Sequence, residues 1–176
     1  RTFLDSKTHN QAAFGYVTEM RHLNKAMQQA LIKEQNINYL CPAKLKNLVQ
    51  TKEQISANID NNGKNITIKA KLLVAADGTN SFIRKHLELK AITQDYNQTA
   101  VVANIGLRRS HYNQAYERFT ASGLIALLPL AKNRSALVWA TSKDEANNLI
   151  NLPEQDFLNN LQLNFGYRLG RFEKVG

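Results

Sequence analysis

Residues 71–87, KLLVAADGTNSFIRKHL, join an apolar run to Asp77-Gly78, a polar turn and a helical pattern. Upstream, residues 65–76 (NITIKAKLLVAA) first alternate between polar and apolar side chains and then become continuously apolar. Alternation is typical of a strand with one solvated face, and a continuous apolar run is typical of a strand buried on both faces. We therefore expect a strand that starts in an antiparallel meander and ends inside a covered sheet.

The Asp-Gly turn is the candidate site. A strand that ends in Asp77-Gly78 and leads into a helix places a carboxylate and backbone N–H groups at the carboxyl edge of a sheet, where ligands of open α/β sheets bind. Gly78 permits close approach to the backbone, and Asn80 or Ser81 can cap the helix. Arg84 can reach back to the carboxylate or to a phosphate. The alternative is a purely structural turn, with a serine cap and an Asp77–Arg84 ion pair.

The pattern around this stretch is mixed α/β. Apolar residues at helical spacing predict a helix from Met20 to about residues 33–35. Short strands are expected at 37–41 (INYLC), 43–50 (AKLKNLVQ) and 54–60 (QISANID). The sequence NNG at 61–63 predicts a tight hairpin turn, because Asn and Gly tolerate positive φ.

The second half reads as mostly antiparallel β. Strands are expected at 99–107 (TAVVANIGL), 115–120 (AYERFT), 123–130 (GLIALLPL) and 135–141 (SALVWAT). Pro153 opens a last helix, and Gly166 ends it. The change of pattern falls near residues 90–98. We therefore expect a segment 1–18 that belongs to the β-sheet domain and leads into a partial cofactor-binding domain at 19–92, followed by the β-sheet domain itself at 93–176.

Composition narrows the class of protein. The 176 residues are 43% hydrophobic and 21% charged, which is ordinary for a globular protein, and no apolar run approaches the length of a spanning helix. The single cysteine, Cys41, and four scattered histidines give no metal-binding pattern. A net charge of +9 fits a soluble basic surface, an anionic cofactor or an anionic membrane, and we find no nucleic-acid motif.

The residue identities in several segments, and not only their spacing, resemble those of a known protein family. LLVAADGTNSFIR at 72–84 resembles the second fingerprint of the class A FAD-dependent aromatic hydroxylases. The blocks TAVVANI, AYERFT, GLIALLPL and SALVW, together with LNFGYRLGRFEKVG at 163–176, are similar in order to the branch of that family that hydroxylates ubiquinone precursors. The resemblance implies part of a Rossmann-like FAD-binding domain with a β-meander, and an antiparallel substrate domain as in p-hydroxybenzoate-hydroxylase-like flavoproteins.

Carried over by position, the resemblance implies residues that bind the cofactor. Arg21, at the start of the helix in MRHLNKAM, matches an arginine that contacts the phosphate and ribityl region of the flavin. The backbone of Leu45 falls at the position where the backbone of family members contacts the adenine of the cofactor. The Asp-Gly fingerprint, near both the flavin diphosphate and the region that NADPH uses, is matched by Asp77, Gly78, Ser81 and Arg84.

On the substrate side, the resemblance implies that ERFT and GLIALLPL belong to the sheet that roofs the isoalloxazine ring. Pro129 would lie close to that ring, and Leu128 would face it. The alternative for Leu127, Leu128 and Leu130 is that they are plain core residues.

The chain also departs from the family. Its eight glycines include no Gly-x-Gly-x-x-Gly, and the later Gly-Asp motif of the family is absent as well. We therefore expect the central part of a longer protein, which by itself binds FAD weakly or not at all. We also expect unpaired sheet edges in this chain to favour self-association.

For the whole protein, the resemblance implies an FAD- and NADPH-dependent monooxygenase that hydroxylates a polyprenylated phenol by way of a C4a-hydroperoxyflavin. Implied partners are a membrane surface and other ubiquinone-biosynthesis proteins, and the implied location is the bacterial cytoplasm, at the periphery of the inner membrane. No arrangement of residues identifies a catalytic acid or base. The alternatives are a hydroxylase of another ring position and a non-catalytic binding or assembly module of flavoprotein shape.

Overall fold

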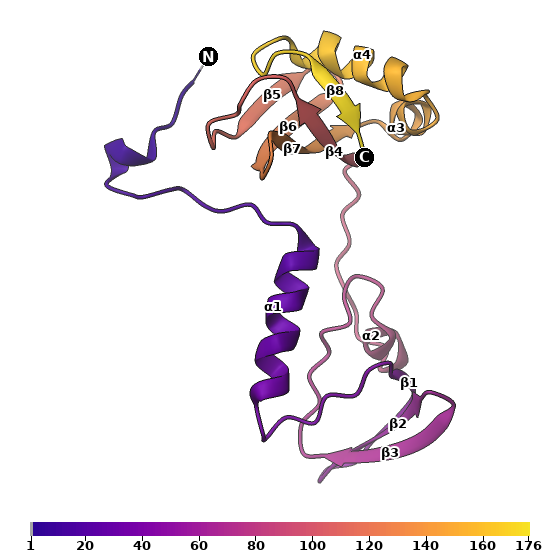
Figure 1. The fold of residues 1–176 in the computed structure, drawn as a ribbon. Coiled ribbons are helices and arrows are strands. Elements are labelled where there is room, and N and C mark those ends of the chain that lie inside the picture. The colour runs from indigo at the N-terminus through magenta and orange to yellow at the C-terminus, as the bar shows by residue number, and fades with distance from the viewer. Residues whose placement is uncertain (1) are drawn as a thin grey trace. The chain divides into compact units, whose positions relative to one another are not determined.

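The computed structural model describes residues 2–176, which divide into two compact units. One, here called the sheet unit, combines the chain up to Asn24 with the segment from Asp95 onward. The other, here called the meander unit, is formed by residues 25–94. The helix α1 (Met20–Lys33) has its first residues in the sheet unit and the rest in the meander unit, and its limits agree with the predicted helix (Figure 1).

The meander unit is built on a three-stranded antiparallel sheet in the order β1-β2-β3. Its strands are β1 (Lys44–Gln50), β2 (Ile55–Asn61) and β3 (Lys64–Ala70). The predicted hairpin turn is present, with Asn62 at φ 53° and Gly63 at φ 78°, and the Gly63 N–H donates to the Asp60 carboxylate at 2.9 Å. The meander packs against the short helix α2 (Phe82–His86) through Leu48, Ala57 and Ile83.

The buried strand expected at 71–76 is not formed. Residues 72–78 lie outside any strand, and the side chains of Leu72 and Val74 are 75% and 74% exposed. Within residues 2–176 no strand pairs with this segment, so its backbone lacks the ladder of hydrogen bonds that a strand requires. The short strand expected at 37–41 is absent from these residues too, for the same reason.

The sheet unit carries a five-stranded sheet in the order β5-β6-β7-β4-β8, in which every neighbouring pair is antiparallel. Its strands are β4 (Thr99–Leu107), β5 (Tyr116–Thr120), β6 (Gly123–Leu130), β7 (Arg134–Thr141) and β8 (Phe172–Val175). The first four were predicted to within one residue at each end. The short 3-10 helix η1 (Ser6–His9) belongs to the same unit.

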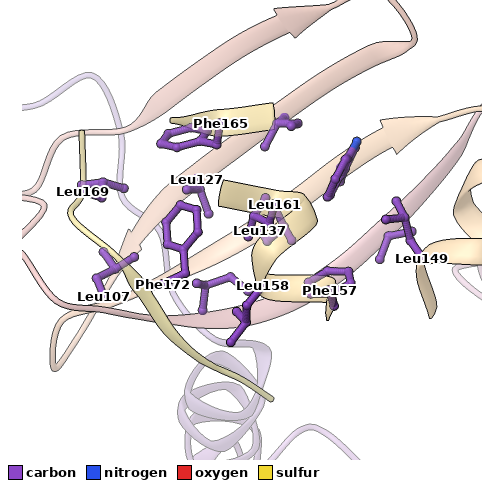
Figure 2. Packing of buried hydrophobic residues seen from close by; sticks show 14 of the residues in the cluster. Leu107, Leu127, Leu137, Leu149, Phe157, Leu158, Leu161, Phe165, Leu169 and Phe172 are labelled. Atoms are coloured by element: carbon purple, nitrogen blue, oxygen red, sulfur yellow. The ribbon is translucent and has the colours of Figure 1, made fainter. Parts of the chain in front are cut away.

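Two helices, α3 (Lys143–Ile150) and α4 (Glu154–Phe165), pack on the sheet (Figure 1). Figure 2 shows Leu127 and Leu137 from the sheet gathered with Leu161 and Phe165 from α4. Each fully buried side chain of this kind contributes roughly 1.5–3 kcal/mol relative to exposure. The mixed α/β class with antiparallel sheets agrees with the predicted fold class.

Candidate functional site

The Asp-Gly turn is ordered by hydrogen bonds onto the first turn of α2. The Asp77 carboxylate accepts the Ile83 N–H at 3.2 Å, and the Ser81 hydroxyl accepts the Arg84 N–H at 3.0 Å as the N-cap of the helix. The Ser81 hydroxyl first, and then the N–H groups of Ile83 and Phe82, hold the pKa of Asp77 below its usual range. Asp77 is therefore an anion that the start of α2 fixes in place.

Gly78 is required by its backbone conformation and lies in open space. Its φ is +77°, a value that L side chains rarely adopt, and a Cβ built there meets no atom within 4 Å. Backbone N–H groups beside an open turn are available to a ligand that approaches closely.

Arg84 folds back over the turn and does not pair with Asp77. Its Nη2 donates to the Thr79 carbonyl, and no ion pair joins Arg84 to Asp77 among the residues that the structure describes. The structural alternative is therefore right about the serine cap and wrong about the ion pair. The carboxylate, the capping hydroxyl and the guanidinium belong to one short turn.

Leu45 lies in the same unit as this turn. It is half-buried in β1 and packs against the small core of Leu48, Ala57 and Ile83. The register of β1 against β2 shifts between Leu45 and Asn47, which marks a bulge beside Leu45. His86 ties α2 to β1 through a 2.9 Å contact between its Nε2 and the Leu48 carbonyl oxygen. The structure thus brings Leu45 and residues 77–84 onto one small scaffold.

Arg21 belongs to the sheet unit, where it takes part in an ion-pair network that sequence reasoning missed. Its Nε and Nη2 donate to Glu19 Oε2 at 3.2 and 2.7 Å, and Arg134 Nη1 on β7 donates to Glu19 Oε1 at 3.1 Å. Donation from Arg21 and then Arg134 lowers the pKa of Glu19 from 4.5 to about 2. Glu19 and Arg134 are 115 positions apart, so no local pattern indicates their contact.

Pro129 lines an open pocket of about 600 Å³ at the β6–β7 turn, together with Val17 and His111. His111 is buried, its Nδ1 accepts the Asn113 N–H at 3.0 Å, and its Nε2 lies 2.8 Å from the Leu130 carbonyl oxygen. Because Nδ1 is an acceptor, Nε2 carries the proton and donates it to that carbonyl. The imidazole thus fastens the 111–113 segment to β6 and forms one wall of the pocket.

Leu128 is half-buried, whereas Leu127 and Leu130 are buried and belong to the core, as the alternative reading expected. Side chains alternate along β6, so Leu128 lies on the face of the sheet opposite Leu127. The two predicted substrate-side residues therefore have different surroundings, since Leu128 lies on a half-open face of the sheet and Pro129 lines a pocket.

Residues 2–176 contain no group of three or more His, Cys, Asp or Glu side chains placed to hold an ion. None of the helices in these residues combines the length and the apolar character that crossing a bilayer requires.

A meander that carries an Asp-Gly turn, and an antiparallel sheet packed with helices, form part of the p-hydroxybenzoate-hydroxylase-like fold of FAD-dependent monooxygenases. The chain is similar in fold to pqsL, described as a probable FAD-dependent monooxygenase from Pseudomonas aeruginosa (TM-score 0.67, 18% identity, 88% of this chain and 46% of that one). It is also similar to OxyS anhydrotetracycline hydroxylase from Streptomyces rimosus (TM-score 0.57, 20% identity, 91% of this chain and 32% of that one).

The family follows from the sequence. A family model described as an FAD binding domain matches residues 4–173, so the chain belongs to this family of flavoproteins. The ubiquinone hydroxylase UbiL of Rhodospirillum rubrum is 34% identical over 166 residues, which cover 94% of this chain and 38% of that protein. The mitochondrial ubiquinone biosynthesis monooxygenase COQ6 of Homo sapiens is 41% identical over 97 residues, 54% of this chain and 21% of that protein. The chain thus spans less than half the length of these relatives.

Proposed function

We propose that the chain is the central part of an FAD- and NADPH-dependent monooxygenase that hydroxylates a polyprenylated phenol in ubiquinone biosynthesis. The observation that carries this proposal is the match to the FAD-binding family over residues 4–173, combined with similarity to two ubiquinone-pathway hydroxylases. The particular substrate that we propose is a 2-polyprenyl-6-methoxyphenol, because the segment at 163–176 resembles the hydroxylase of that compound. The chain alone is expected to be inactive.

The Asp-Gly turn fits the phosphate-bearing part of a dinucleotide. Open space at Gly78 leaves room for a ligand close to the backbone, and the Arg84 guanidinium at the same turn is a donor for a phosphate oxygen. Asp77 is anionic and fixed by α2, so it is suited to accept a hydroxyl or amide proton, and an anionic phosphate would lie away from it. We assign Asp77, Gly78, Ser81, Arg84 and the backbone of Leu45 to the cofactor.

Arg21 is the proposed contact on the sheet unit. Two of its donor groups are taken by Glu19, which fixes the direction of the guanidinium, and a guanidinium has five N–H donors in all. The side chain is 69% exposed, so the remaining donors are open to a phosphate or ribityl oxygen.

When bound, FAD supplies the redox chemistry, taking electrons from NADPH and activating O₂ for transfer to the phenol ring. The residues of this chain bind and orient the cofactor and the substrate, and they exclude water from the site. We assign Pro129 and Leu128 to the wall that faces the ring system, because Pro129 lines a pocket and Leu128 lies on the half-open face of β6. We assign residues 19–92 to the cofactor domain and 93–176 to the substrate domain. We assign the segment 1–18 to the substrate domain as well, as a stretch that leads into the cofactor domain; its first residue lies outside the described part of the chain.

The experiment that tests the proposal restores the flanking sequence of the parent protein. The purified parent is expected to carry FAD, to oxidise NADPH when a prenylated phenol is present, and to yield the hydroxylated ring. A parent that folds without flavin and oxidises no NADPH would support a binding or assembly module instead. Complementation of bacterial mutants blocked at each hydroxylation of the ubiquinone ring separates the proposed ring position from the others.

A further inference from the structure

Two basic segments lie side by side at one end of the sheet unit. The Arg108 N–H donates to the Arg171 carbonyl at 3.1 Å, and the Arg109 N–H donates to the Leu169 carbonyl at 3.2 Å. Arg168 precedes Leu169 in the chain. The backbone pairing therefore brings four arginines, Arg108, Arg109, Arg168 and Arg171, onto two neighbouring stretches, here called the arginine patch.

The turn between these stretches is packed closely under the arginine stems. A Cβ built on Gly170, whose φ is +74°, would lie 2.9 Å from Arg109 Cγ and 3.4 Å from Arg108 Cβ. The methylene groups of two arginines therefore lie against the protein surface. Packing of this kind lowers the entropy that the charged ends lose when they bind a partner.

The charges of the arginine patch are not neutralised by ion pairs within residues 2–176. All four residues are exposed, and none of them takes part in an ion pair among the residues that the structure describes. Arg118 adds a further guanidinium at the end of α4, where its Nη1 donates to the Phe165 carbonyl at 2.7 Å. Clustered cations without counter-ions repel one another, so an anionic partner is the complement of this surface.

Large apolar and aromatic side chains flank the arginines in the chain. Leu163 on α4 is 80% exposed, Tyr167 is 64% exposed and Tyr112 is 81% exposed. Tyrosine is enriched where a protein meets the headgroup level of a bilayer, because its ring is apolar and its hydroxyl is polar. Single-stranded nucleic acid is bound mainly by charged and aromatic side chains, whereas an exposed leucine adds to binding at the interface of a bilayer.

We propose that the arginine patch, with Leu163 and Tyr167, docks the protein on an anionic phospholipid bilayer. The arginines bind lipid phosphates, and the leucine and tyrosine enter the interfacial layer. The inference rests on the proposed function in one respect, since a polyprenylated phenol resides in a bilayer and must be taken from it. It goes further by assigning a surface of this chain to that contact.

The test is sedimentation of the 176-residue chain with lipid vesicles. The chain is expected to sediment with phosphatidylcholine vesicles that contain about 30% phosphatidylglycerol, and to remain in solution with phosphatidylcholine alone. About 0.5 M NaCl is expected to release it, because exposed charges are screened at that ionic strength.

A charge-matched pair of variants locates the surface. Neutralising the arginine patch (Arg108→Gln, Arg109→Gln, Arg168→Gln, Arg171→Gln) is expected to lower the vesicle partition coefficient at least tenfold. The control removes the same charge from exposed lysines of the meander unit and is expected to lower it less than threefold. It carries Lys52→Gln, Lys64→Gln, Lys69→Gln and Lys71→Gln. Circular dichroism spectra equal to that of the parent chain establish that both variants are folded.

A second variant, Leu163→Ser with Tyr167→Ser, keeps every charge and is expected to weaken vesicle binding at least threefold. The proposal is overturned if the patch variant binds vesicles like the parent chain, if the lysine control loses as much, or if the serine variant loses nothing. It is also overturned if the patch is needed for binding single-stranded RNA and dispensable for vesicles. Because no arm uses flavin or turnover, failure here leaves the proposed hydroxylase activity untouched.

Discussion

Gly78 shows how one residue limits what the Asp-Gly turn can be. Its side chain position is open, so size alone would permit alanine, but its φ of +77° is unfavourable for any residue with a Cβ. Gly78→Ala is expected to destabilise the meander unit by about 1–2 kcal/mol. Urea unfolding of the two proteins measures this difference. Gly15→Ala is the control, since Gly15 has no positive φ and a Cβ there also meets nothing within 4 Å; equal effects of the two changes would contradict the backbone explanation.

Glu19 makes a pH prediction possible. Its folded pKa of about 2 lies below the ordinary 4.5, so the ionised form stabilises the fold above pH 4.5, and this contribution is lost as the pH falls toward 2. Glu19→Gln removes the ion pairs and is expected to be less stable than the parent chain at pH 7. The difference in free energy of unfolding between the two proteins is expected to shrink steadily from pH 4.5 downward. A difference that stays constant over this range would show that the carboxylate charge is not what stabilises the network.

Among the secondary-structure elements, strands with an apolar sequence of sufficient length between clear turns could be predicted from the sequence. β6 and β7 are apolar, bounded by a turn, and buried on a face covered by α4, so their composition and their setting agree. α3 was missed because its eight residues, KDEANNLI, are mostly polar and bury only Ala146 and Leu149. β8 was missed because four residues are too few to show a period.

The segment at 71–76 was predicted as a buried strand because it is apolar. Burial depends on neighbouring strands, and within residues 2–176 none pairs with it. The apolar composition of residues 71–76 therefore indicates that they are suited to a buried strand. Whether they form one depends on a neighbouring strand that can pair with them. The same limit applies to the candidate site, where Ser81 as a cap was predictable from local sequence and the Glu19–Arg134 contact was not.

A substitution series tests this account of residues 71–76. Leu72→Ser and Val74→Ser are expected to change the free energy of unfolding by less than about 0.5 kcal/mol, as exposed positions do. Leu48→Ala removes a buried side chain of the meander unit, which is 5% exposed, and is expected to cost about 2–5 kcal/mol. Denaturant titration of the three variants gives these values. A cost for Leu72→Ser close to that of Leu48→Ala would mean that the segment is buried in solution.

For the molecule as a whole, the two units differ in the size of their cores. The sheet unit buries a large cluster that includes Trp139 and Phe157, whereas the meander unit buries Leu48, Ala57 and Ile83. Stability is therefore expected to be unequal, with the meander unit opening first. The proposed cofactor residues are distributed over both units, since Arg21 belongs to the larger one and residues 77–84 to the smaller.

Two further properties of the 176-residue chain can be predicted, its flavin content and its state of association. The 176-residue chain contains no Gly-x-Gly-x-x-Gly, so we expect it to retain little FAD after purification; a near-stoichiometric flavin absorbance band would contradict this. The edge strands of the meander and the exposed Leu72 and Val74 offer unpaired backbone and apolar surface. Light scattering is expected to show association that increases with protein concentration, and a uniform monomer at high concentration would count against it.

The Glu19–Arg134 ion pair has a consequence for the order in which the chain folds. It closes a loop of 115 positions, and the meander unit lies entirely inside that loop. Closing a flexible loop costs chain entropy that grows with the logarithm of its length. A meander that has already become compact shortens the effective loop, so we expect the pair to form late. Glu19→Gln should then accelerate unfolding while leaving the folding rate nearly unchanged.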